Sequence, residues 1–85
     1  MVKSAQFVKI LSNGIETNFS RASVENNLPG ESYYDIMVNR KGEKLSLVIK
    51  KNDRGFWGIQ NRVQLPLWVI DLEPELIRAV KQNEV

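Results

Sequence analysis

The amino-acid sequence predicts a small α+β fold: a mostly antiparallel β-sheet, a short helix near residues 21–27 and a C-terminal helix near residues 73–83. Three observations lead to this prediction. Two β-like runs flank an Asn-Gly pair near the N-terminus, two further runs between residues 33 and 50 alternate apolar and polar residues, and apolar residues recur at helical spacing near the C-terminus. The 85 residues amount to a single small domain, residues 1–85, and no repeat or linker divides them.

The N-terminal run "AQFVKILSNGIETNF" predicts two short strands joined by a tight turn. Asn13 and Gly14 both tolerate a positive φ angle, which tight hairpin turns require. The next stretch, "SRASVENN", predicts the short helix at residues 21–27, because Ser20 can cap its first turn and the Leu-Pro-Gly sequence at 28–30 would end it.

The strongest pattern in the chain is an antiparallel hairpin made by "ESYYDIMVNR" and "EKLSLVIKK", with a turn at residues 40–43. Each run places three apolar side chains on one face, namely Tyr34, Ile36 and Val38 in the first, and Leu45, Leu47 and Ile49 in the second. Side chains alternate between the two faces of a strand, so this pattern predicts a hairpin with one buried face.

A second turn at residues 52–55 precedes "FWGIQ", which predicts a third strand, and "RVQLPLWVI", which predicts a fourth. Pro66 lacks an N–H and would confine the fourth strand to an edge or a bulge. We expect at least one tryptophan to be a core residue. Phe56 and Trp57 would point to opposite faces, so the one outside the core is the better candidate for contact with a partner.

The tail "DLEPELIRAVKQNEV" predicts a helix at residues 73–83. Pro74 suits a first helical turn, where its missing N–H costs nothing, and acidic residues precede basic ones along the helix dipole. Leu72, Leu76, Ile77 and Val80 form one apolar stripe.

Several classes of chemistry are excluded by composition. The chain has no cysteine and no histidine, which removes disulfides, thiolate nucleophiles, imidazole acid–base groups and the usual zinc ligand sets. No glycine-rich phosphate loop is present, and the carboxylates of residues 71–75 do not have the spacing of an EF-hand. We therefore expect no enzymatic activity, no cofactor and no metal.

The sequence does not indicate where the protein is localised. The longest uncharged, apolar-rich run is the eight residues from Val63 to Ile70, far short of the roughly 20 that a membrane-spanning helix needs. The N-terminus lacks the pattern of a signal peptide. We expect neither a transmembrane helix nor a signal peptide, and the localisation stays open.

Four segments, taken in order, resemble parts of one known domain. "ILSNGIETNFS" is similar to a strand with an Asn-Gly turn, "RASVENNLPGE" takes the place of a peptide-flanking helix, "YDIMVNRKGEKLSLVIKK" is similar to a final hairpin, and "RGFWGIQ" to a closing strand. Together, residues 10–60 resemble the latter half of a PDZ domain of the site-2 membrane protease type. The first part of that domain, with its carboxylate-binding loop and peptide-receiving strand, has no counterpart before Phe7. The resemblance implies a peptide groove flanked by residues 21–27.

The leading functional hypothesis is a non-enzymatic protein- or peptide-interaction module that binds an extended segment at a sheet edge. The candidate peptide-binding residues are Arg21, Ala22, Val24, Glu25 and Trp57. An incomplete sheet also leaves room for homo-oligomers, formed by strand pairing or by the apolar stripe of the C-terminal helix.

Two alternatives stay open. Residues 40–54 hold half of the twelve basic side chains of a chain whose net charge is only +2, and could form a nucleic-acid surface. Its candidate residues are Arg40, Lys41, Lys44, Lys50, Lys51 and Arg54. Lysines on the outward face of a hairpin also serve solubility and edge protection. The second alternative is a structural subunit that acts only by assembly.

Overall fold

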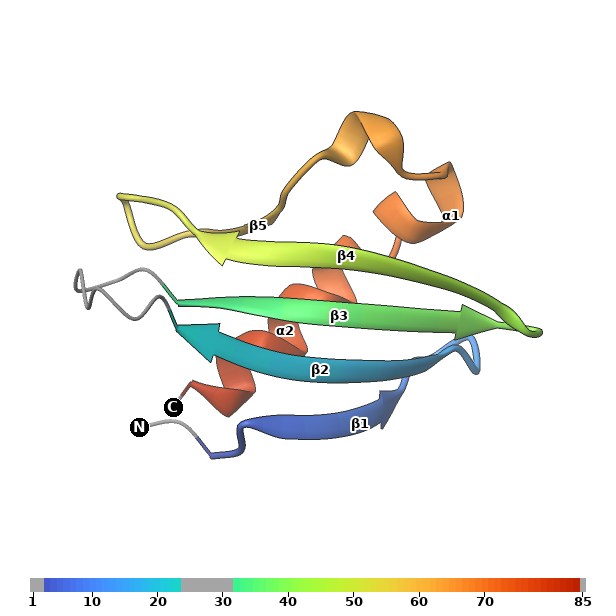
Figure 1. Cartoon of the computed structure of the whole chain (residues 1–85), viewed down its shortest axis with the longest axis horizontal. Coiled ribbons are helices and arrows are strands. Elements are labelled where there is room, and N and C mark those ends of the chain that lie inside the picture. Colours follow the sequence, from blue (N-terminus) through green and yellow to red (C-terminus); the bar gives the residue numbers. More distant parts are fainter. Residues whose placement is uncertain (1–2, 24–31, 85) are drawn as a thin grey trace.

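The computed structural model describes residues 3–23 and 32–84. Figure 1 shows one sheet with a helix crossing behind it. The sheet has five antiparallel strands in sequence order: β1 (Gln6–Ile10), β2 (Glu16–Ser23), β3 (Ser32–Arg40), β4 (Glu43–Lys51) and β5 (Trp57–Ile59). After β5 come a 3-10 helix, η1 (Arg62–Gln64), and two α-helices, α1 (Leu67–Ile70) and α2 (Glu73–Asn83). The predicted small α+β class, with an antiparallel sheet and a C-terminal helix, is confirmed.

Short turns join β1 to β2 and β3 to β4. Gly14, between β1 and β2, has a φ of 81°, a conformation that residues with a side chain rarely adopt. At the β3–β4 turn Lys41 and Gly42 both have positive φ angles, 52° and 88°. Two positive φ angles are the signature of the tight hairpin turn whose twist matches that of the flanking strands.

The β3–β4 hairpin forms as predicted. Its register pairs Ile36 with Leu47, and Tyr34 with Ile49, and all four side chains are buried. Neighbouring residues such as Asp35 and Met37 point to the opposite face and are exposed. The sheet therefore has a helix face, covered by α2, and an open face.

The helix predicted at residues 73–83 is confirmed as α2. Its buried side chains are Leu76, Ala79, Val80 and Asn83, and Leu72 just before it is buried as well. These positions recur every three or four residues, so they form one stripe, and this stripe packs on the helix face of the sheet.

The strand predicted for "RVQLPLWVI" is wrong. Asn61 adopts a left-handed conformation, with a φ of 57°, and turns the chain away from the sheet into η1 and α1. Pro66 has no N–H to give to a ladder, and it precedes α1 as its N-cap. The apolar residues that contact the core here, Leu65, Trp68, Val69 and Leu72, have helical spacing. This spacing is a signal in the sequence that alternation alone does not detect.

The helix predicted at residues 21–27 is wrong where the structure describes it. Residues 21–23 continue β2, and Arg21 pairs with Tyr34 of β3 on one side. On the other side its N–H donates to the carbonyl of Ala5 at 2.7 Å. Pairing with β3 on one side and the hydrogen bond to Ala5 on the other favour the extended chain over a helical turn. Residues 24–27 lie outside the described residues.

Candidate functional site

β1 is an edge strand whose outer side is open. In the β1–β2 ladder, Leu11 bonds to Ile15, and Ala5 to Arg21, so the odd-numbered residues of β1 turn their backbone groups toward β2. Gln6, Val8 and Ile10 turn theirs outward. Within residues 3–23 and 32–84, no hydrogen-bond partner meets the outward N–H and C=O groups of these three residues.

Two side chains along this edge, those of Val8 and Ile10, are apolar and exposed. Val8 and Ile10 each expose 59% of their surface on the open face, whereas Phe7 packs on the helix face, where its ring stacks on Phe19 at 4.5 Å between centroids. Edge strands of soluble proteins usually carry charges or a covering segment that prevents pairing with another chain. The outward positions of β1 carry no charge.

The opposite edge of the sheet is closed by contrast. β5 has only three residues, and the outward N–H of Ile59 donates to a carboxylate oxygen of Glu73 at 3.0 Å. The second oxygen of Glu73 accepts from Arg62 at 2.8 Å, which holds the carboxylate in place. Of the two edges, β1 is therefore the one that can accept a further strand.

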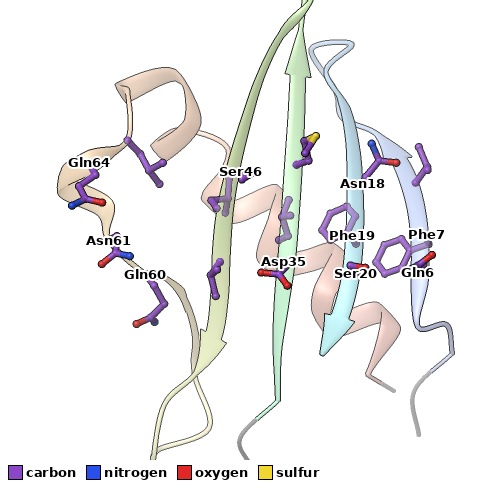
Figure 2. A pocket seen from close by; sticks show the side chains of 16 residues that line it. Gln6, Phe7, Asn18, Phe19, Ser20, Asp35, Ser46, Gln60, Asn61 and Gln64 are labelled. Carbon is purple, nitrogen blue, oxygen red and sulfur yellow. The ribbon is translucent and has the colours of Figure 1, made fainter. Parts of the chain in front are cut away.

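A groove of about 690 Å³ crosses the open face from β1 to the segment after β5 (Figure 2). Two cross-strand rows form its floor. One row joins Gln6, Ser20, Asp35 and Val48, and the other joins Val8, Asn18, Met37 and Ser46. The far wall comes from Gln60, Asn61, Gln64 and Leu65.

The side chains that line this groove are uncharged except at one position. Its polar side chains are five amides, two hydroxyls and a single carboxylate, that of Asp35, and Figure 2 shows Asp35 on the central strand between Ser20 and Ser46. Within the described part of the chain, Asp35 forms no ion pair and accepts no hydrogen bond. A volume between roughly 300 and 1,000 Å³, apolar patches and a few polar groups are typical of ligand sites.

The three predicted peptide-binding residues that the structure describes do not share one face of the sheet. Ala22 lies on the open face, paired with Tyr33, whereas Arg21 and Trp57 lie on the helix face beside Tyr34. The Trp57 ring meets the Tyr34 ring edge-on at 5.6 Å. Val24 and Glu25 lie outside the described residues.

Arg21 is occupied by partners within the chain. Its Nε donates to Glu84 at 2.7 Å and its Nη2 donates to Ser32 at 2.8 Å, while the Tyr34 hydroxyl also donates to Glu84. Burial would raise the pKa of Glu84, but the hydrogen bonds from Arg21 and Tyr34 and the charge of Arg21 outweigh it and lower the pKa. Burial, followed by the hydrogen bond to Glu84, raises the pKa of Tyr34. This cluster holds the end of α2 against the sheet.

The six basic residues proposed for nucleic acid fall into two groups. Arg40, Lys41 and Lys44 lie at the β3–β4 turn, and Lys50, Lys51 and Arg54 lie at the other end of β4. Lys44 and Lys50 are six positions apart along extended strand, a separation of about 20 Å. These residues therefore do not form one continuous patch.

Two of the basic side chains pair with aromatic rings or carboxylates. The Arg40 guanidinium lies 4.1 Å from the centre of the Trp68 ring and 3.3 Å from Glu43, and the Lys51 ammonium lies 5.9 Å from the Trp57 ring. Both tryptophans are half-buried against the core, and Phe56 is 63% exposed. Of this adjacent pair, Trp57 therefore packs against the core and Phe56 lies outside it.

The functional candidates that sequence reasoning missed are Gln6, Val8, Ile10 and Asp35. Val8 and Ile10 alternate with Phe7 and Lys9, so a half-buried strand is visible in the sequence, but its position at the edge is not. Among the described residues no group of three or more carboxylates could hold a metal ion. Within the same ranges no helix has the length and apolar character needed to cross a membrane.

Comparison of the chain with protein-family models, with curated proteins and with solved structures finds no significant match. The likeness of residues 10–60 to a PDZ domain therefore stays a prediction from sequence.

Proposed function

We propose that this protein is a non-enzymatic protein-interaction module that binds an extended segment along the outer edge of β1. The observation that carries the proposal is the row of outward N–H and C=O groups on Gln6, Val8 and Ile10, which meet no partner within the described residues. In strand addition, main-chain hydrogen bonds supply affinity, and the side chains beside the new strand supply selectivity.

The residues around this edge favour a partner strand of alternating apolar and acidic residues. Apolar side chains on the open face would cover Val8 and Ile10, which are exposed. On the helix face the added strand would lie beside Lys9. Within residues 3–23 and 32–84 its ammonium donates a hydrogen bond only to the neutral amide of Gln82, at 3.1 Å. Residues 3–10 contain two lysines and no carboxylate, so an acidic partner suits them better than a second copy of β1.

The test is an amide-shift titration of the ¹⁵N-labelled chain with a capped seven-residue peptide of alternating valine and glutamate. We expect saturable shifts in residues 6–10 and none in β5. Proline in place of Val8 removes an outward N–H that the β1–β2 ladder does not use, so V8P should abolish the shifts and leave the β3–β4 amides unchanged. The matched control V8A keeps the N–H and should weaken binding by about two- to fivefold.

Other outcomes decide between the alternatives. Equal binding by V8P and the unmodified chain would reject strand addition at β1. A concentration-dependent mass that V8P abolishes would identify the added strand as a second copy, and so the chain as an assembly subunit. Shifts at the two basic groups with single-stranded oligothymidine, lost steeply as salt rises, would support the nucleic-acid alternative.

A further inference from the structure

The open-face groove has dimensions that suit an extended chain lying across the strands. Five strands spaced by about 4.8 Å place β1 and β5 about 19 Å apart, which five or six extended residues can span at about 3.4 Å each. The groove is open along its length rather than closed into a cavity, and Figure 2 shows polar side chains on both walls, with Gln6 on one side and Gln60, Asn61 and Gln64 on the other.

The lining groups match the needs of a peptide backbone. Each side-chain amide offers one acceptor oxygen and an NH₂ donor, the complement of the N–H and C=O that every residue of an extended peptide presents. The groove is also lined by Val8, Met37, Val48 and Leu65, which provide apolar contact for small side chains. Methionine adapts its shape readily, so Met37 can accommodate different neighbours.

The single charge in the groove specifies one further property of its occupant. Asp35 lies on the central strand, with Ser20 and Val48 directly beside it. Its diagonal neighbour on β4, Lys50, does not come within ion-pair distance. A carboxylate that meets no partner among the described residues, in a groove whose other lining residues are neutral, attracts one positive charge and disfavours a negative one.

We propose that the groove is a second binding site, for an extended peptide segment that carries one arginine or lysine flanked by small apolar residues, with the basic side chain on Asp35. This site goes beyond strand addition at β1, because it uses side chains of the open face and needs no pairing with the edge of the sheet.

The experiment titrates the ¹⁵N-labelled chain with a capped pentapeptide, valine-alanine-arginine-alanine-valine, and with the same peptide carrying uncharged citrulline in place of arginine. We expect saturable shifts at Ser20, Asp35, Val48 and Gln60, and binding about fivefold weaker for the citrulline peptide. Asp35→Asn should weaken binding of the arginine peptide by the same factor and leave the affinity for the citrulline peptide unchanged. Asp53→Asn, the same substitution in the exposed turn after β4, should change the affinity for neither peptide.

The proposal would be overturned by equal affinity of D35N and the unmodified chain for the arginine peptide, by shifts confined to residues outside the groove, or by no saturable shift at all. Free agmatine, which carries the guanidinium without a peptide backbone, serves as a third ligand. If it bound as tightly as the pentapeptide, the occupant would be a small cation instead of a peptide segment. If strand addition at β1 failed, the valine-glutamate peptide would cause no shifts in residues 6–10, but the arginine peptide would still shift Asp35. The two proposals can therefore fail independently.

Discussion

Asn83 is a buried amide that fastens the start of the described chain to the end of α2. Its Oδ1 accepts the N–H of Ser4 at 3.0 Å, and its Nδ2 donates to the carbonyl of Ser4 at 2.9 Å and to the Tyr34 hydroxyl at 2.8 Å. The Lys3 N–H also donates to the Asn83 carbonyl, at 2.8 Å. A buried polar side chain is tolerated only when its hydrogen bonds are satisfied, and here the bonding also positions the segment that leads into β1.

Glu84 makes stability depend on pH. Its folded-state pKa lies below the ordinary value of 4.5, chiefly because the hydrogen bonds from Arg21 and Tyr34 offset its burial. A carboxylate whose pKa is lower in the folded state than in the unfolded state stabilises the fold at pH values above its unfolded-state pKa. This contribution is lost as the pH falls through the folded-state pKa. Glu84→Gln should therefore cost about 1–2 kcal/mol at pH 7, with a smaller cost near pH 3, as measured by urea unfolding.

The matched control is Glu43→Gln, since Glu43 pairs with Arg40 through side chains that are 57% and 44% exposed. Exposed pairs contribute little, so this change should stay within about 0.5 kcal/mol at both pH values. An equal cost of Glu84→Gln at pH 7 and pH 3 would show that the charge of Glu84 does not stabilise the fold.

Among the elements, α2 has two different sides. The side toward the sheet is apolar, and Leu76 at its centre is fully buried. The flank of α2 toward β1 is polar, where Gln82 contacts Lys9 and Glu75 accepts from Ser12. The helix therefore both covers the core and sets the chemistry beside the β1 edge, where the proposed partner strand would lie.

Leu76→Ala tests the contribution of this helix. Removing a fully buried leucine leaves a cavity and should reduce the free energy of unfolding by about 2–5 kcal/mol. Arg78→Ala, at an exposed position of the same helix, should change it by less than about 0.5 kcal/mol. Comparable losses for the two variants, measured by urea unfolding, would contradict the packing described for α2.

At the scale of the whole molecule, α2 is the main cover of the helix face. Phe19, Tyr34, Ile36 and Ile49 are buried there, while the open face carries the groove. Figure 1 shows the strands on one side of the molecule and α2 on the other. A two-layer domain of this size buries a modest share of its surface, so loss of one layer removes much of its stability.

A chain that ends at Asp71 should therefore lack a cooperative fold. We expect its amide spectrum to lose dispersion and its thermal unfolding to lose a sharp transition, because the apolar residues of the helix face would meet water. A dispersed spectrum with the shifts of β3 and β4 intact would mean that the sheet folds without α2.

Local pattern determined much of this fold. Alternation placed Tyr34, Ile36 and Val38 on one face, the Asn-Gly and Lys-Gly pairs marked tight turns, and the apolar stripe with Pro74 located α2. These features depend on residues close together in the chain, so short-range rules suffice. The same rules failed at residues 61–70, where alternation and helical spacing compete, and at Arg21–Ser23, where pairing with β3 outweighs the local signs of a helix.

The candidate sites were decided by the tertiary structure. Val8 and Ile10 become an open edge only because β1 is the outermost strand, and Asp35 becomes the lone charge of a groove only because β2 and β4 bring neutral side chains beside it. Arg21, a candidate for peptide binding from sequence, instead meets Glu84, 63 residues away in the chain. The sequence by itself sets which residues share a face of each element. Strand order and helix packing set which faces and edges remain open, because both depend on contacts between distant parts of the chain.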